Sequence, residues 1–236
     1  MTIITAVQKG DQIAIACDTQ STGGNTRHSA EYNINRSKIL NYGETFWGFA
    51  GATSIHQIFE DLFAESEPPP LLSRRDIFRW LLAQQNHLKE HYYIKTDISH
   101  DRQQAVEASQ GNALVATPYG IYSINHYRFV QEYSKFWALG SGSDIALGAM
   151  EILYTQELTA SEIAEAGAVT ATKFNIHCAP PIRVKTIQKA TQPASKATKT
   201  KKQATTRKST TRKASTRKTS ARKTSARKST TRKKES

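Results

Sequence analysis

The strand-like segments of this 236-residue chain come in adjacent pairs, separated by two to four turn-forming residues. A glycine in each connection favours the tight turns of β-hairpins. Because strands joined in this way run antiparallel, the pattern excludes a doubly wound parallel sheet. The predicted hairpins pair residues 2–7 with 12–17, 38–42 with 45–50, and 112–117 with 121–125.

A first pair of helices is predicted between the second and third hairpins. Apolar residues recur at helical spacing from residue 53 onward, with Thr53 or Ser54 as the expected N-cap. Three consecutive prolines at residues 68–70 end this helix. Ser73 then opens a second helix, and Asp76, three residues later, resembles the second half of a capping box.

A second pair of helices follows a short strand at residues 136–139. The first begins after the glycine-rich stretch at residues 140–144, and the second begins at the capping box formed by Thr159 and Glu162. An extended piece at residues 182–187 completes the order of strands, two helices, strands, two helices and a strand. This order predicts an α+β fold of two stacked antiparallel sheets with helix pairs outside them, a four-layer αββα sandwich.

Charge divides the chain into two parts. Residues 189–236 hold 18 of the 33 lysines and arginines and one of the 20 acidic residues, a net charge of +17. Residues 1–188 carry a net charge of −4. We therefore predict a folded domain at residues 1–188 and a separate tail at residues 189–236.

The tail is a low-complexity sequence of Lys, Arg, Ser, Thr and Ala. Arg-Lys pairs recur every five residues from Arg207-Lys208 to Arg232-Lys233, a period that does not place them on one face of a helix. The composition predicts disorder and resembles the tails of linker-histone-like proteins. It suits nucleic acid binding through phosphates without base readout. Polyphosphate, acidic protein segments or a solubilising role are the alternatives.

Several classes of protein are excluded by what the sequence lacks. Cys17 and Cys178 are far apart and form no CxxC pair, and the seven histidines show no HExxH spacing, so we expect no disulfide framework and no metal site. The chain has no nucleotide-binding motif, signal peptide or membrane-spanning apolar run. We expect a cytoplasmic protein that needs no cofactor and does not enter a membrane.

Thr2 stands at the start of the first predicted strand. Removal of Met1 would make it the amino terminus, with a hydroxyl nucleophile and an α-amine base on one residue. This arrangement is typical of N-terminal-nucleophile hydrolases. The alternative is that a small residue follows Met1 only because methionine aminopeptidase accepts one there.

Four motifs occur in the order found in proteasome β-type subunits. They are the segment at residues 2–7, Asp18, the segment Gly48-Phe49-Ala50-Gly51, and the segment Leu139-Gly140-Ser141-Gly142. The resemblance covers about residues 2–187 and is strongest to bacterial HslV-type peptidases and bacterial proteasome homologues. It implies the αββα sandwich and a threonine peptidase that assembles into rings around a chamber.

The resemblance also implies a role for particular residues. Thr2 would be the nucleophile, Asp18 matches the aspartate of the family, and Lys38 matches the lysine that sets the electrostatics of the threonine. Arg36 is a rival for the place of Lys38, although a guanidinium cannot shed a proton. The Gly51 amide would stabilise the oxyanion.

The glycine-rich turn carries the last predicted site residue. Ser141 matches the serine that hydrogen-bonds near the amine of the nucleophile. Proteasome β-subunits also carry an Asp-x-x-Ser pair after the penultimate helix, and here Asn175 and Cys178 stand at those places. This departure predicts reduced activity or a local rearrangement. The resemblance places Phe49 near the pocket for the residue before the scissile bond, with a core role as the alternative.

Three functions follow from these observations. The first is a peptidase of a stacked double ring, acting on peptides or unfolded proteins, with nucleic acid bound by the tail near the nucleoid. Any ATP-driven unfoldase would be a separate protein. The second is an inactive ring that acts as a nucleic-acid-associated scaffold, and the third is an N-terminal-nucleophile amidase acting on a small amide.

Overall fold

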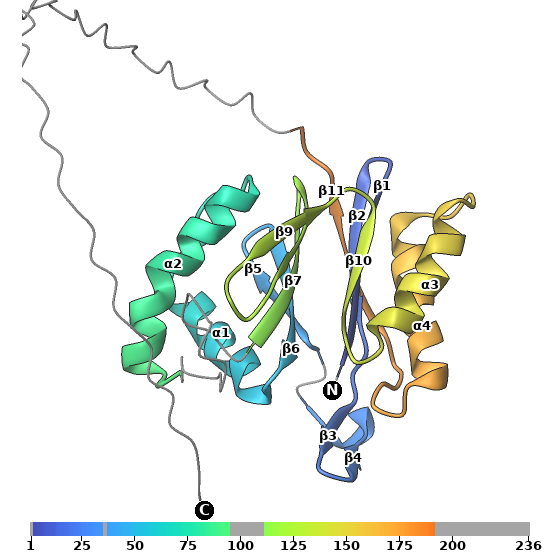
Figure 1. The fold of residues 1–236 in the computed structure, drawn as a ribbon, viewed down its shortest axis with the longest axis horizontal. Helices are drawn as coiled ribbons and strands as arrows, with labels where there is room; N and C mark the ends of the chain where they lie inside the picture. Colours follow the sequence, from blue (N-terminus) through green and yellow to red (C-terminus); the bar gives the residue numbers. More distant parts are fainter. Residues whose placement is uncertain (1, 35–36, 95–110, 192–236) are drawn as a thin grey trace, which may run out of the picture. The chain divides into compact units, whose positions relative to one another are not determined.

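A computed structural model describes residues 2–34, 37–94 and 111–191 of the chain (Figure 1). Two antiparallel sheets stack face to face, and a pair of helices covers the outer face of each. The predicted α+β fold, a four-layer αββα sandwich, is therefore confirmed. The predicted tail falls outside the described residues from residue 192 onward, and its disorder stays a prediction.

The sheet that carries Thr2 has the strand order β10-β1-β2-β11. Every neighbouring pair in it is antiparallel, and Ile4 lies opposite both Cys17 of β2 and Leu139 of β10. Two helices that pack on each other cover its outer face. The strands are β1 (Ile3–Lys9), β2 (Gln12–Cys17), β10 (Phe136–Gly140) and β11 (Arg183–Gln188), and the helices are α3 (Ser143–Tyr154) and α4 (Ala160–Phe174).

The second sheet has the order β5-β6-β7-β8-β9 and is antiparallel throughout. Its strands are β5 (Ile39–Tyr42), β6 (Thr45–Gly51), β7 (Gly111–Thr117), β8 (Gly120–Ile124) and β9 (Val130–Tyr133). Helices α1 (Thr53–Glu65) and α2 (Arg74–His91) cover it.

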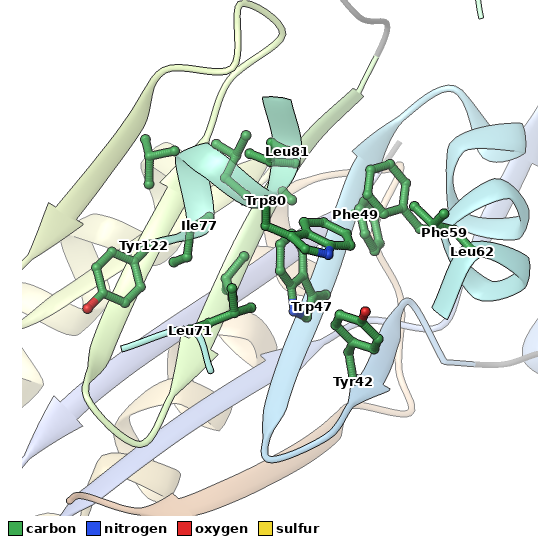
Figure 2. Close-up of a cluster of buried hydrophobic side chains, with 14 of the residues drawn as sticks. Tyr42, Trp47, Phe49, Phe59, Leu62, Leu71, Ile77, Trp80, Leu81 and Tyr122 are labelled. Carbon is green, nitrogen blue, oxygen red and sulfur yellow. The ribbon is translucent and has the colours of Figure 1, made fainter. Parts of the chain in front are cut away.

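Three buried clusters hold the layers together. Aliphatic residues such as Ile4, Ile15 and Leu114 fill the space between the sheets. Small residues, mainly alanines of β2, α3 and α4, fill the layer beyond the first sheet. Aromatic rings fill the layer beyond the second sheet, where the Trp47 and Trp80 rings lie 5.4 Å apart (Figure 2). The backbones of α4 and β1 approach closely enough for the Thr5 hydroxyl to donate to the Ala164 carbonyl at 2.7 Å.

The structure corrects the sequence prediction at several places. The N-cap of α1 is Ala52, not Thr53 or Ser54, and no side chain caps this helix. Ser73 and Thr159 are N-caps as predicted. Strand β9 was not predicted. Between Asp18 and β5 the chain also forms β3 (Ser21–Gly23), β4 (Thr26–His28) and a 3-10 turn at Ala30–Tyr32. Among the described residues, no helix is long and apolar enough to cross a membrane.

Candidate active site

Thr2 lies at the end of the sandwich where β1 begins, which we call the Thr2 end. Its side chain is buried, and its carbonyl accepts hydrogen bonds at 3.5 Å from the Gly142 N–H and from the Ser141 hydroxyl. Gly140 has a φ of +105°, and a Cβ atom on it would lie 2.1 Å from the Thr2 carbonyl oxygen. Only glycine allows this approach, so the β10–α3 turn holds the backbone of Thr2 in place.

Asp18 and Lys38 form an ion pair next to Thr2. The Lys38 Nζ lies 2.6 Å from the Asp18 Oδ1, and the carboxylate is fully buried while the lysine side chain is 16% exposed. Asp18 follows β2 directly and Lys38 immediately precedes β5, so the pair joins the two sheets. The ammonium group is therefore fixed in position at the rim of the site.

The Asp18 carboxylate also organises the backbone around it. It accepts hydrogen bonds from the N–H groups of Ile3 at 3.0 Å, Gln20 at 3.3 Å and Ala179 at 3.3 Å. With Lys38, four donors satisfy the buried charge, as a buried carboxylate requires. Because Ile3 follows Thr2 directly, Asp18 fixes the start of β1 as well as the lysine.

Ser141 contacts the two residues that depart from the proteasome pattern. The Asn175 side chain donates to the Ser141 carbonyl at 2.6 Å, and the Cys178 sulfur lies 3.9 Å from the Ser141 hydroxyl. Both residues therefore lie beside the β10–α3 turn. Burial raises the pKa of the Cys178 thiol to about 11, so this residue is protonated at neutral pH and is a poor nucleophile.

Gly51 ends β6 and precedes the uncapped start of α1. It has a φ of +127°, which favours glycine. Thr2, Lys38 and Gly51 all line one cavity of about 370 Å³. The cavity opens to solvent, because its wall includes exposed residues of α1.

The cavity contains functional candidates that the sequence analysis did not identify. His56, Gln57 and Glu60 on α1 line it together with Thr2. A signal was available: these residues lie in the first half of the helix that follows the Gly51-Ala52 segment. Phe49 also borders the cavity but is buried in the aromatic cluster, with its ring 4.7 Å from that of Phe59.

The predicted site residues thus occupy one region of the molecule. Thr2, Lys38 and Gly51 face the cavity, Asp18 lies beneath Lys38, and Ser141 contacts the carbonyl of Thr2 from the β10–α3 turn. Arg36, the rival of Lys38, is outside the described residues. No group of three His, Cys, Asp or Glu side chains suited to a metal ion occurs in the described part of the chain.

The αββα sandwich, with Thr2 directly before the central strand β1, matches the fold of the N-terminal-nucleophile hydrolases. Among solved structures, the chain is similar to the bacterial proteasome homologue BPH of Thiobacillus denitrificans. BPH in the structure of its complex with epoxomicin is 36% identical in sequence to this chain, and the two structures superpose with a TM-score of 0.74. The match covers 80% of this chain and 100% of the BPH chain. A second BPH structure is 35% identical with a TM-score of 0.73, covering 80% and 99%.

A more distant likeness supports the fold alone. HslV from Trypanosoma brucei is 18% identical with a TM-score of 0.53, covering 79% of this chain and 99% of that one. No protein-family model and no curated protein matches the chain. The match to BPH decides the family: the chain belongs to the proteasome β-subunit family of threonine peptidases, among its bacterial proteasome homologues.

Proposed function

We propose that the chain is a threonine endopeptidase in which Thr2, freed by removal of Met1, is the nucleophile. The observation that carries this proposal is the shared cavity of Thr2, Lys38 and Gly51 above the buried Asp18. An α-amine titrates near ~7.7–8 and suits a base at neutral pH. The role of each residue follows from its position.

The reaction begins when the Thr2 Oγ attacks the carbonyl carbon of the scissile bond. The hydroxyl proton passes to the α-amine of Thr2, and Lys38 stabilises the negative charge left on the Oγ. The oxyanion accepts a hydrogen bond from the Gly51 N–H. The amine then gives its proton to the leaving nitrogen, an ester forms on Thr2, and water hydrolyses this ester.

Ser141 and Asp18 would act by positioning. Ser141 touches the Thr2 carbonyl, and Asp18 fixes both the start of β1 and the ammonium of Lys38. Neither residue needs to exchange a proton with the substrate. Their removal should therefore displace Thr2 relative to the cavity.

Intact mass spectrometry with epoxomicin tests this function. Wild-type protein should lack the mass of Met1 and gain one adduct per chain. Thr2→Ala should gain none and lose peptide cleavage by a factor of about 10³ or more. Thr2→Ser, which keeps a hydroxyl, is the matched control and should still be labelled. Cleavage that persists in Thr2→Ala would overturn the assignment of the nucleophile.

We further propose that the chains assemble into a homo-oligomeric ring, stacked in pairs, that acts on peptides or unfolded protein in the cytoplasm. Native mass spectrometry of the full chain should give a closed oligomer. A monomer at micromolar concentration would contradict the assembly. A separate ATP-driven unfoldase would be needed for folded substrates.

A catalytically weak ring that acts as a scaffold is the second candidate. The observation that favours it is the presence of Asn175 and Cys178 at the Ser141 turn, where the family has an aspartate and a serine. The double variant Asn175→Asp with Cys178→Ser distinguishes the two candidates. If the scaffold reading is right, the variant should gain cleavage activity that the wild type lacks.

The tail is proposed to bind nucleic acid, which would place the particle at the nucleoid. Deletion of residues 192–236 leaves β11 and its contacts intact and should abolish DNA retention at low salt while short-peptide cleavage continues. For the full chain, the logarithm of the DNA-binding constant should fall linearly with the logarithm of the salt concentration, with a slope of about −0.9 for each phosphate contact. Equal DNA retention by the truncated chain would contradict this role.

A further inference from the structure

The charge inside the cavity points to the residue class that the enzyme selects. Among the side chains of the described cavity wall, those charged at neutral pH are Lys38 and Glu60. Lys38 is neutralised by its ion pair with Asp18 at 2.6 Å. The Glu60 carboxylate has no ion pair among the described residues, so it supplies the uncompensated side-chain charge of the wall.

The neighbouring histidine does not offset this charge. Burial lowers the pKa of His56 below its ordinary value of 6.5, an effect that the charge of Glu60 only partly opposes. His56 is therefore neutral at pH 7. Its Nε2 atom is buried and has no hydrogen-bond partner within the described ranges, and its ring meets the Phe49 ring edge-on with centroids 6.2 Å apart.

Glu60 also borders a second cavity, which adjoins the first. The second cavity, of about 530 Å³, shares Ser37, His56 and Glu60 with the first, and Arg183 lines its other side. No ion pair joins Arg183 to Glu60 within the described residues. A carboxylate thus stands where two open cavities meet, one of which contains Thr2.

We propose that the cavity beside Thr2 selects a substrate with lysine or arginine at the residue before the scissile bond, and that Glu60 determines this specificity. The stem of a long basic side chain can lie along Phe49 and His56 while its charged group reaches Glu60. The inference rests on the proposed peptidase function, because it assigns the substrate class of the same site.

Cleavage of matched fluorogenic peptides with Arg, Leu or Glu before the scissile bond tests the inference. Wild-type protein should have its highest kcat/KM for the Arg peptide and its lowest for the Glu peptide. Glu60→Gln, which keeps the size of the side chain, should lower the Arg-to-Leu ratio of kcat/KM about fivefold to tenfold. Glu60→Lys should make the Glu peptide better than the Arg peptide.

The control is Glu151→Gln, the same charge change at an exposed position of α3. It should keep the wild-type ratio. The inference is overturned if epoxomicin still labels Thr2 but the wild type prefers the Leu peptide. It is also overturned if labelling persists and the Arg-to-Leu ratio of kcat/KM is unchanged in Glu60→Gln. Absence of both labelling and cleavage overturns the peptidase function itself, so the two failures are distinguishable.

Discussion

The Thr2 end of the sandwich and the opposite end, where β1 turns into β2 at Gly10, start their helices in different ways. At the Thr2 end, α1 begins after Gly51-Ala52 and α3 begins after Gly142, and neither has a side-chain cap. At the Gly10 end, α4 begins with the capping box of Thr159 and is tied to β2 by a bond from the Ser161 N–H to Gln12.

Helix α2, in the other outer layer, is like α4: it begins away from the Thr2 end and has a side-chain cap. Its N-cap is Ser73, whose side chain accepts a hydrogen bond from the helix. Shortly before Ser73, Pro68 lies next to Gly43 in the β5–β6 turn, at the opposite end of β6 from Gly51. Side-chain capping of helices is thus concentrated at the Gly10 end. The Thr2 end leaves backbone N–H groups without side-chain caps near Thr2, where the proposed mechanism needs an oxyanion donor. We expect changes at the Thr2 end to alter activity and changes at the Gly10 end to alter only stability.

The largest difference between the ends is expected from two glycines with positive φ. Gly140→Ala should abolish cleavage and lower the free energy of unfolding by about 3 kcal/mol or more, because the new Cβ would lie 2.1 Å from the Thr2 carbonyl. Gly10→Ala, where nothing lies within 4 Å, should cost only roughly 1 kcal/mol of strain and keep activity. If Gly140→Ala and Gly10→Ala lowered stability and peptide cleavage by equal amounts, the expected difference between the two ends would be refuted.

The ion pair should give the next largest effect. Lys38→Met leaves the buried Asp18 carboxylate with three backbone donors but no cation, so the free energy of unfolding should fall by about 2–4 kcal/mol and cleavage should be lost. Lys185→Met on the exposed face of β11 is the control. Chemical denaturation that separates the two variants by less than 1 kcal/mol would mean that the pair does not stabilise the fold.

A smaller effect is expected from the cap of α4. Thr159→Ala removes the hydroxyl that accepts from the Glu162 N–H and should lower the free energy of unfolding by about 1 kcal/mol. Peptide cleavage at a temperature well below the unfolding midpoint should stay at the wild-type rate. A parallel loss of kcat would show that the two ends are coupled.

The smallest effect concerns pH at the Thr2 end. Burial raises the pKa of the Cys17 thiol from 9.0 to about 11. Between these values the unfolded chain has lost the proton and the folded chain keeps it, so stability falls as pH rises. When the pH is raised from 8 to 10, the free energy of unfolding should therefore fall by roughly 1 kcal/mol more in the wild type than in Cys17→Ala. Identical pH profiles in denaturant titrations would contradict this expectation.

The sequence predicts the fold well because its signals are local. Hairpin turns, the caps at Ser73 and Thr159, and the helical spacing of apolar residues all depend on neighbours within a few residues. The cap of α1 was misplaced because the helix begins at the sheet edge after Gly51, and the strand sets its start. Strand β9 was missed because its four residues show little apolar alternation and depend on pairing with β8.

The candidate site was predictable where a motif marks the residue. Asp18 and Lys38 are 20 residues apart, and the family resemblance rather than any local pattern singled them out; their ion pair is seen only in the structure. His56 and Glu60 could not be assigned from the sequence, since ordinary polar residues on a surface helix look the same. Their proximity to Thr2 depends on how α1 packs across the end of the second sheet.

The last strand leaves the folded body at the Gly10 end. The Lys189 N–H bonds to the Asp11 carbonyl and the Ala190 N–H bonds to the Pro118 carbonyl, each at 2.7 Å, so residues 189 and 190 lie on two hairpin turns. The seven residues of β1, roughly 24 Å at 3.4 Å each, separate this point from Thr2. Thr191 is therefore a suitable junction for a fluorescent protein or an affinity handle, because a graft at this position stays away from Thr2, the proposed nucleophile.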